Sequence, residues 1–231
     1  MLRKMVGATA ATIVLLVSLP SGASLASPDS FDKTQHSLTD ANSPWVIVNK
    51  KNPLSPLKYE PAKLVRIKQF NGGNLPLADI TAAAFLNLAK AGKAAGAGSI
   101  SIASGFRSYS RQVQVHAQDV AKFGLLAGEK LAARPGYSEH QTGLAVDVWA
   151  PTQGCRIRVC FGTTKAGTWL RKNAWKYGFI IRYPDGSYPV TGYQYEPWHL
   201  RFVGVELSTE MHAQGVTILE NFFNYPAAPK Y

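Results

Sequence analysis

SEHQTGLAVD, residues Ser138–Asp147, joins a histidine to an aspartate through small and apolar residues. Apart from Asp147, the residues from Leu144 to Trp149 are apolar, which predicts a short buried strand that carries Asp147, with His140 on the approach to it. A second stretch, EPWH at Glu196–His199, adds another histidine and another carboxylate. The two stretches together offer two imidazoles, one carboxylate ligand and one spare carboxylate.

These side chains are the parts of a metal site that activates water. Two neutral imidazoles and one carboxylate leave a Zn²⁺ ion with residual positive charge and an open coordination position, which lowers the pKa of a bound water toward roughly 7. Glu196 is close enough to His199 in sequence to take a proton from that water and pass it to a leaving amine. Pro197 predicts an extended segment or a helix start there. The HExxH motif of helix-borne zinc peptidases is absent, so we expect another type of metal hydrolase.

The histidines also have a structural interpretation, because a lone histidine is more often a packed or surface residue than a metal ligand. The chain has five histidines. His36 falls in a polar segment, and His116 and His212 fall in helix-like stretches without an acidic partner at motif spacing. We interpret these three as structural or solvated. His140 and His199 differ because each comes with a carboxylate and with small or aromatic neighbours.

Four segments of the chain carry a resemblance to a known family. They read SGFRSYSRQ (Ser104–Gln112), PGYSEHQTGLAVD (Pro135–Asp147), YGFIIRYP (Tyr177–Pro184) and TGYQYEPWHLRFVG (Thr191–Gly204). In order and spacing they resemble the VanY-type D-alanyl-D-alanine carboxypeptidases, which belong with the LAS zinc peptidases of bacterial cell walls. The resemblance extends from about Pro44 to Tyr225.

The resemblance implies a role for each matching residue. One Zn²⁺ ion is expected, and the implied ligands are His140, Asp147 and His199. Glu196 matches the catalytic base. Arg107 matches an arginine that stabilises the polarised carbonyl or grips the substrate carboxylate, since its planar fork suits either anion. Further matches to substrate-pocket positions are Gln112, Ser138, Tyr183 and Trp198.

The sequence departs from the family pattern at two pocket positions. Phe106 stands where tyrosine is frequent, and Tyr137 stands where histidine is frequent, which bears on the polarity of the pocket and leaves the chemistry unaffected. Some implied roles have simpler alternatives. Arg107 could form a surface ion pair, Trp198 could be a core aromatic and Ser138 could be a turn hydroxyl.

Residues 1–26 have the layout of a secretory signal peptide. Arg3 and Lys4 precede an apolar run from Met5 to Leu19, and Ser24–Ala26 provides a small-x-small site, so we expect cleavage after residue 26. The apolar run is shorter than the roughly 20 residues of a spanning helix, which makes an uncleaved anchor the weaker alternative. The prediction is a secreted or cell-envelope protein with no membrane span after cleavage.

The charge of the chain is strongly basic. It is +11 at pH 7, and removal of residues 1–26 leaves 23 Lys plus Arg against 14 Asp plus Glu, a net charge of +9. A basic exported protein is attracted to anionic envelope polymers. The charges are scattered rather than gathered in a basic stripe within a known module, so no nucleic-acid partner is expected.

Cys155 and Cys160 are the two cysteines of the chain. In an oxidising compartment a local disulfide is their expected state, and it would contribute roughly 2 kcal/mol to stability on the chain-entropy model. The alternative is a thiolate metal site, which lacks a further cysteine or a nearby histidine to complete it.

One domain is expected after the signal peptide. Residues 27–43 are polar and short of aromatics, which predicts a flexible leader. Residues 44–225 are enough for a single core and form the predicted zinc carboxypeptidase domain. Residues 226–231 form a short C-terminal tail.

Helices alternate with short strands in this domain. Helices are predicted over residues 79–95, 110–123 with Ser110 as N-cap, 168–177 and 206–214. Strands are predicted over residues 99–103, 144–149, 179–183 and 198–203, with a hairpin-like turn at Pro184–Gly186. The fold class is therefore α+β, with a small, mainly antiparallel central sheet and surrounding helices. The resembling family has this Hedgehog/DD-peptidase-like architecture, with zinc in a cleft on one face.

Three functions remain open from the sequence. The leading one is a secreted, monomeric zinc carboxypeptidase that removes the C-terminal D-amino acid, D-Ala by preference, from peptidoglycan stem peptides. The terminal residue stays open among D-Ala, D-Lac and D-Ser, and the stem between pentapeptide and tetrapeptide. The second is a cell-wall endopeptidase on the same scaffold. The third is a non-peptidase metal-binding protein, for example an Fe(II) oxygenase with a facial triad, for which the chain shows no redox cosubstrate site.

Overall fold

The computed structural model describes residues 31–70 and 73–231. The chain divides into two units, Met1–Phe31 and Asp32–Tyr231, and the fold given below is that of the second. The predicted signal peptide, residues 1–26, and the first residues of the predicted leader lie outside the described residues. None of the helices in the described ranges combines the length and the apolar composition that crossing a membrane requires.

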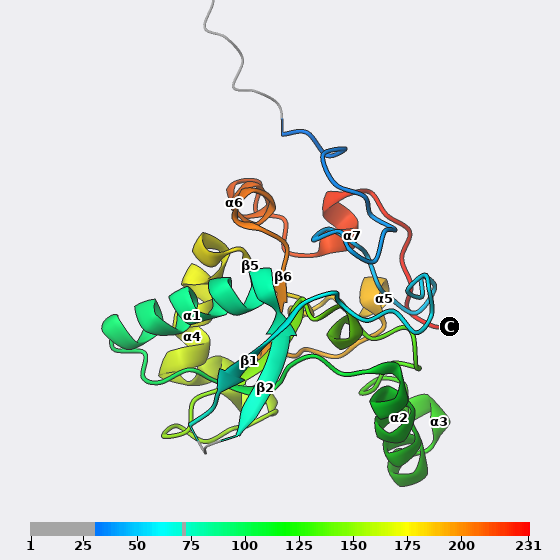
Figure 1. Cartoon of the computed structure of the whole chain (residues 1–231), viewed down its shortest axis with the longest axis horizontal. Helices are drawn as coiled ribbons and strands as arrows, with labels where there is room; N and C mark the ends of the chain where they lie inside the picture. The colour runs from blue at the N-terminus through cyan, green and yellow to red at the C-terminus, as the bar shows by residue number, and fades with distance from the viewer. Residues whose placement is uncertain (1–30, 71–72) are drawn as a thin grey trace, which may run out of the picture. The chain divides into compact units, whose positions relative to one another are not determined.

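Short strands and short helices alternate along the second unit (Figure 1). The strands are β1 (Leu64–Lys68), β2 (Asn74–Ala78), β3 (Ser101–Ser104), β4 (Ala145–Trp149), β5 (Phe179–Ile181) and β6 (His199–Phe202). The α-helices are α1 (Asp79–Ala94), α2 (Tyr109–Phe123), α3 (Leu125–Gly128), α4 (Lys165–Asn173), α5 (Tyr188–Thr191), α6 (Val205–Ala213) and α7 (Leu219–Phe222). Three 3₁₀ turns complete the description: η1 (Glu139–Thr142), η2 (Val159–Thr163) and η3 (Ala174–Tyr177).

The central sheet has the strand order β3-β4-β6-β5, and each neighbouring pair is antiparallel. Side chains alternate between the two faces of a strand. Val146 and Val148 of β4 therefore pack in the core together with Leu200 of β6, while Asp147 and His199 point to the other face. The sequence expectation of an α+β fold with a small antiparallel sheet is confirmed.

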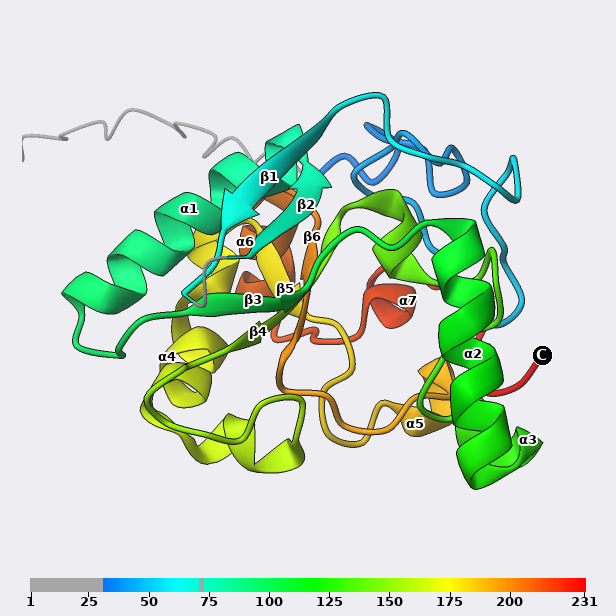
Figure 2. The same cartoon turned by 60° about the horizontal axis from the view of Figure 1, so that its bottom comes forward.

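The main core lies between this sheet and the helices on one side of it. Phe85 and Leu88 of α1 and Leu170 of α4 are at most 2% exposed, and they pack with the apolar sheet residues. The β1–β2 hairpin adds Ile67 and Leu77 to the same core. In Figure 2 the hairpin and α1 lie together, whereas α2 and α3 stand at the far side of the sheet. The apolar face of the sheet is thus closed, and its polar face is left to form a site.

The segment before β1 packs against the rest of the second unit through its aromatic and aliphatic side chains. Trp45 is 2% exposed, and its Nε1 donates a hydrogen bond to the carbonyl of Val203 at 3.0 Å. Ala41, in the predicted flexible leader, is 3% exposed and packs in a small cluster with Val46 and Leu144. The segment therefore contacts the chain just before β4 and just after β6, and the predicted leader is packed on the domain at Ala41.

The predicted helices and strands are found with small shifts at their ends, except that the helix predicted over residues 168–177 is divided into α4 and the 3₁₀ turn η3. Three further local features differ. Helix α2 begins after Ser108, whose Oγ accepts a hydrogen bond from the Arg111 amide at 3.3 Å, so the predicted N-cap Ser110 is wrong. The turn at Pro184–Gly186 leads into α5 and does not join β5 to β6 as a tight hairpin. The sequence analysis did not predict the β1–β2 hairpin, whose strands are short and half exposed.

Candidate functional site

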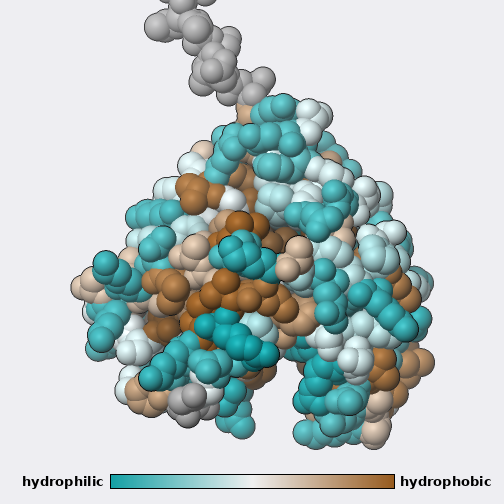
Figure 3. All heavy atoms as spheres, in the orientation of Figure 1, coloured by the Kyte–Doolittle hydropathy of each residue, from teal (hydrophilic) through white to brown (hydrophobic). Residues whose placement is uncertain are grey.

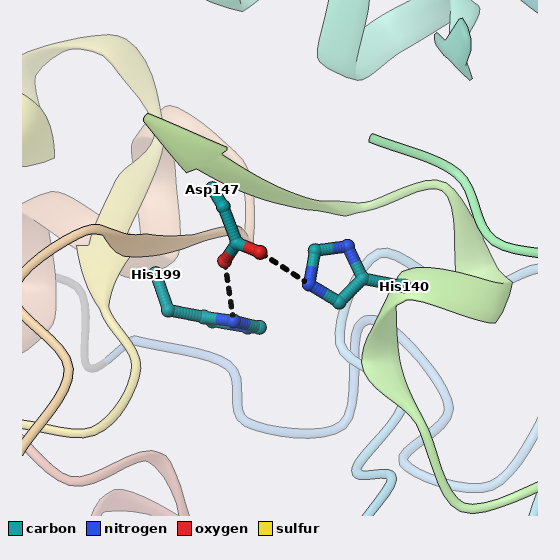
Figure 4. A group of neighbouring side chains, drawn as sticks. All are labelled: His140, Asp147 and His199. Atoms are coloured by element: carbon teal, nitrogen blue, oxygen red, sulfur yellow. Dashed lines mark ion pairs between the residues drawn. The ribbon is translucent and has the colours of Figure 1, made fainter. Parts of the chain in front are cut away.

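Three side chains that can hold a metal ion converge on the polar face of the sheet (Figure 4). Asp147 of β4 and His199 of β6 are paired across the sheet, and His140 reaches the same point from η1. Asp147 Oδ2 lies 3.1 Å from His140 Nε2, and Asp147 Oδ1 lies 3.1 Å from His199 Nδ1. One potential ligand atom from each residue lies within 4.8 Å of the other two. The residues that the sequence singled out as ligands are thus brought together.

Local structure explains the position of His140. Strand β3 has an irregularity between Ile102 and Ser104, after which the chain turns away from β4. This leaves the carbonyl of Gly105 2.8 Å from His140 Nδ1, so that nitrogen donates a hydrogen bond and Nε2 faces Asp147. Both histidine rings are almost fully buried, at 5% exposure each.

The charge balance of the cluster favours a cation. Burial alone would raise the pKa of Asp147, but His140 and His199 hold it well below its usual range. Burial alone would lower the pKa of His199, but the neighbouring carboxylates of Asp147 and Glu139 raise it to about 9. The carboxylates therefore stabilise positive charge at the point where the three side chains meet.

An unsatisfied oxygen of Asp147 is a second indication of a bound cation. Its Oδ1 atom is buried and has no hydrogen-bond partner among the described residues. A buried polar atom is normally satisfied, and a carboxylate oxygen beside two imidazole nitrogens is a ligand set that Zn²⁺ prefers. The residues present therefore fit a divalent metal ion.

Glu196 lies beside this cluster without belonging to it. Its Oε2 is 3.7 Å from His199 Nδ1, and its side chain is 12% exposed. The Glu196 amide donates to the carbonyl of Tyr183, and its own carbonyl accepts from the His199 amide, so the backbone on both sides is fixed. Burial raises the pKa of Glu196 to about 8, and the charge of Asp147 adds to the effect.

A cleft of about 500 Å³ opens over the cluster. It is lined by His140, Asp147, His199 and Glu196 together with four other residues of interest: Arg107, Ser138, Tyr183 and Trp198. Residues of α2 form another wall, and the space-filling view shows the surface hollowed beside the α2–α3 pair (Figure 3). The cleft is large enough for a short peptide segment.

Arg107 is held in this cleft by neutral partners. Its Nη1 donates to Gln112 Oε1 at 2.9 Å, and its Nη2 donates to Ser104 Oγ at 3.0 Å. Gln112 is fully buried and donates in turn to the carbonyl of Ala133. Gln112 therefore lies behind Arg107 and is not among the residues that line the cleft. Among the described residues no carboxylate is bonded to Arg107, so its guanidinium is available to bind an anionic group.

The predicted disulfide between Cys155 and Cys160 is confirmed. It closes a small loop in which Arg156 lies over the Trp149 ring, 5.0 Å from its centroid. Ile157, in the same loop, is one of the apolar residues of the cleft. The alternative of a thiolate metal site is excluded, because no cysteine is free.

Glu139 lies in contact with the cluster, although no role was predicted for it from the sequence. Glu139 is fully buried, and its Oε2 lies 3.4 Å from His199 Nε2. Its other oxygen accepts from two buried arginines, Arg182 and Arg201, which lie far away in sequence. Burial alone would raise the pKa of Glu139, but these arginines hold it well below its usual range. No spacing pattern near Glu139 signals such partners.

Comparison with known proteins identifies one family. The model of the family described as VanY, D-alanyl-D-alanine carboxypeptidase, matches residues 74–205. A D-alanyl-D-alanine carboxypeptidase of Enterococcus faecalis (strain ATCC 700802 / V583) is 34% identical over 193 residues, which cover 78% of this chain and 65% of the relative. The chain spans 44%, 65% and 36% of the length of the first three curated relatives that it matches.

Solved structures agree with this family. The LdcB LD-carboxypeptidase superimposes with a TM-score of 0.71 at 35% identity and covers 80% of this chain and 88% of its own. VanYB in complex with D-alanine-D-alanine gives 0.66 at 32% identity, with coverage of 78% and 96%. A D,D-pentapeptidase VanY from a VanB-type resistance cassette, in complex with Zn(II), gives 0.65 at 31% identity, with coverage of 78% and 98%.

Proposed function

The chain belongs to the VanY family of D-alanyl-D-alanine carboxypeptidases. We propose that it is a zinc-dependent peptidase that removes the C-terminal D-alanine from peptidoglycan stem peptides. The observation that carries the proposal is the buried His140–Asp147–His199 cluster with Glu196 beside it in one cleft. The Zn(II) complex of one relative and the D-alanine-D-alanine complex of another support the choice of metal and of substrate.

The proposed chemistry is hydrolysis of the last peptide bond. A zinc ion bound by the three ligands would supply positive charge, which polarises a carbonyl group and lowers the pKa of a bound water. Glu196 takes a proton from the attacking water while a C–O bond forms to the penultimate carbonyl carbon. It then gives that proton to the nitrogen of the terminal residue as the C–N bond breaks. Burial raises the pKa of Glu196, so this carboxyl holds a proton more readily than an exposed glutamate does, which suits a group that must carry the proton from the water to the leaving nitrogen.

Arg107 completes the proposed site as an anion-binding group. Its guanidinium lies in the cleft and is oriented by Gln112 and Ser104. A planar fork can donate two parallel hydrogen bonds to a carboxylate, or stabilise the oxygen that becomes negative during attack. Ser138, Tyr183 and Trp198 line the same cleft and are proposed to contact the peptide.

A second candidate differs in the bond that is cut. The LdcB relative is an LD-carboxypeptidase, and its structure superimposes with a TM-score of 0.71. The substrate would then be a tetrapeptide, whose terminal D-alanine follows a residue of L configuration, rather than a pentapeptide that ends in two D-alanines. The catalytic groups would act identically on both.

Mass spectrometry of defined stem peptides tests the proposal. The protein, loaded with zinc, is incubated with a pentapeptide ending in D-Ala-D-Ala, with the matching tetrapeptide and with a cross-linked muropeptide. We expect one of the linear peptides to lose a single D-alanine, and the loss to stop on chelation and return with zinc. Cleavage confined to the cross-link would establish an endopeptidase instead, and no cleavage of any of the three would contradict the proposal.

We propose further that this enzyme works outside the cytoplasm as a monomer. Residues 1–26 are assigned to a signal peptide, 27–43 to a leader, 44–225 to the catalytic domain and 226–231 to a tail. The disulfide between Cys155 and Cys160 supports an oxidising compartment, because such bonds are rare in the cytosol. The cell-wall substrates of the relatives support the cell envelope as its place of action.

Arg107→Lys tests the role of the guanidinium. Lysine keeps the charge but loses the planar fork, so kcat/KM for D-alanine release should fall by about 10- to 100-fold, less than the 10²- to 10³-fold that loss of an oxyanion donor costs. Zinc content should stay at the parental value. Arg111→Lys, at an exposed arginine of the same helix region, serves as the matched control and should leave the kinetics unchanged. Parental kinetics in Arg107→Lys would remove Arg107 from the proposed site.

A further inference from the structure

The two ring nitrogens of His199 face different surroundings. Its Nδ1 faces the cluster, 3.1 Å from Asp147 Oδ1 and 3.7 Å from Glu196 Oε2. Its Nε2 faces Glu139, 3.4 Å from Oε2. A neutral imidazole carries one proton, so a metal can bind at one nitrogen only if the proton resides on the other.

The carboxylate of Glu139 is fixed by its own partners. Its Oε1 accepts from Arg182 Nε and from Arg201 Nη1, both at 2.7 Å. Arg182 also donates two hydrogen bonds to Glu220 of α7, at 2.7 and 2.8 Å. The side chains of Glu139, Arg182, Arg201 and Glu220 are all fully buried. Oε2 is therefore the oxygen left to accept a hydrogen bond from His199.

The formal charges of this buried network balance without His199. Two arginines offset two glutamates, so the imidazole does not have to carry a positive charge to stabilise Glu139. The Nε and Nη2 groups of Arg201 are also occupied, by the carbonyls of Phe202, Pro44 and Val46. A buried carboxylate with charged partners on one side can thus accept from a neutral imidazole N–H on the other.

His140 is oriented differently. Its outer nitrogen donates to a backbone carbonyl, that of Gly105, which is neutral. The acceptor for His199 is a carboxylate, which polarises the ring more strongly and makes its free nitrogen a better electron donor to a metal. The two histidines of the cluster therefore differ in strength as ligands, because their outer partners differ in charge.

We propose that Glu139 is a positioning residue of the metal centre. By accepting a hydrogen bond from Nε2–H of His199, it fixes the ring orientation and keeps the Nδ1 lone pair directed at the metal. Arg182 and Arg201 hold the carboxylate in place for this purpose. This inference rests on the proposed function in that the metal is zinc.

Glu139→Gln is the decisive variant. Glutamine has the shape of glutamate, but it presents a hydrogen-bond donor to His199 Nε2 where glutamate presents an acceptor. Arg182 and Arg201 both donate to Oε1, so the amide oxygen of glutamine takes that position and the amide NH₂ faces His199. A donor in that place favours the proton on Nδ1, the nitrogen that the metal needs. Zinc should then bind about 10- to 100-fold more weakly, as measured by competition with a chelator of known affinity.

Glu220→Gln is the matched control. It removes one charge from the same buried network and weakens the contacts of Arg182, but Glu220 is not hydrogen-bonded to His199. A purely structural role for Glu139 predicts equal loss of thermal stability and unchanged zinc affinity in both variants. The proposal predicts weaker zinc binding in Glu139→Gln alone, and zinc affinities within about threefold of each other would overturn it.

Two further measurements keep the test independent of how well that variant folds. In the zinc-loaded parent with ¹⁵N-labelled histidine, NMR should show the proton of His199 on Nε2, and a proton on Nδ1 would overturn the proposal. Glu139→Asp keeps the charge for the arginines but shortens the reach to His199, so its zinc affinity should fall between the parent and Glu139→Gln. If the parent itself bound no zinc, the proposed function would fail, which is a different result from equal binding by parent and variants.

Discussion

Turnover by the Glu196→Gln variant is expected to fall by about 10²- to 10⁴-fold, the usual contribution of a general acid–base group. Glutamine has the shape of glutamate, but its amide cannot take a proton from the attacking water. Glu196 is not part of the His–Asp–His group, so the variant should bind zinc with the stoichiometry of the parent. The measurements are kcat for D-alanine release and zinc content by metal analysis.

The control for this variant is Glu206→Gln, at an exposed glutamate in the first turn of α6. It makes the same chemical change outside the cleft and should leave both turnover and zinc content unchanged. Two results would contradict the role of Glu196. One is near-parental turnover in Glu196→Gln, and the other is loss of zinc as severe as that caused by removing a histidine of the cluster.

Replacing a residue of the cluster is expected to remove both metal and activity. Structural zinc sites with four protein ligands bind with about 10–16 kcal/mol, so one ligand is worth about 2.5–4 kcal/mol, or roughly a 10²- to 10³-fold change in affinity. His140→Ala, Asp147→Ala and His199→Ala should each weaken zinc binding to that extent. Hydrolysis should become undetectable at zinc concentrations that saturate the parent.

His212→Ala is the matched control for the histidine variants. His212 is exposed on α6, where its ring stacks on Trp175, and it does not line the cleft of the cluster. Its removal should leave zinc affinity and turnover at parental values. Full zinc occupancy in any of the three cluster variants would exclude the corresponding residue as a ligand.

The central strands could be predicted from the sequence because they follow from local patterns, and the metal cluster could be predicted because two separate motifs carry its residues and the family resemblance pairs them. In a strand whose apolar side chains fill a core, a single aspartate between two valines must point to the opposite face. Asp147 is then on the face opposite Val146 and Val148, as the structure has it. Helix α1 was predictable for a similar reason, since it is rich in alanine and leucine, and the structure continues the helix through Gly92.

Other features depend on contacts that local patterns do not encode. Ser108 and Ser110 are chemically equivalent as N-caps, and the choice depends on which of them has the extended backbone. The β1–β2 hairpin owes its stability to packing on α1 rather than to strong strand propensity. Glu139 is held in its position by Arg182 and Arg201, and no sequence spacing relates these three residues.

The contact between Arg182 and Glu220 makes the fold of the second unit depend on helix α7. Glu220 of α7 is one of the two acidic partners of Arg182, whose side chain is fully buried. Without α7 the guanidinium would stay buried with a single carboxylate, which costs stability because a buried charge needs its full set of partners. A chain that stops before α7 is therefore expected to unfold at a lower temperature than the whole chain, although every residue of the metal cluster is still present.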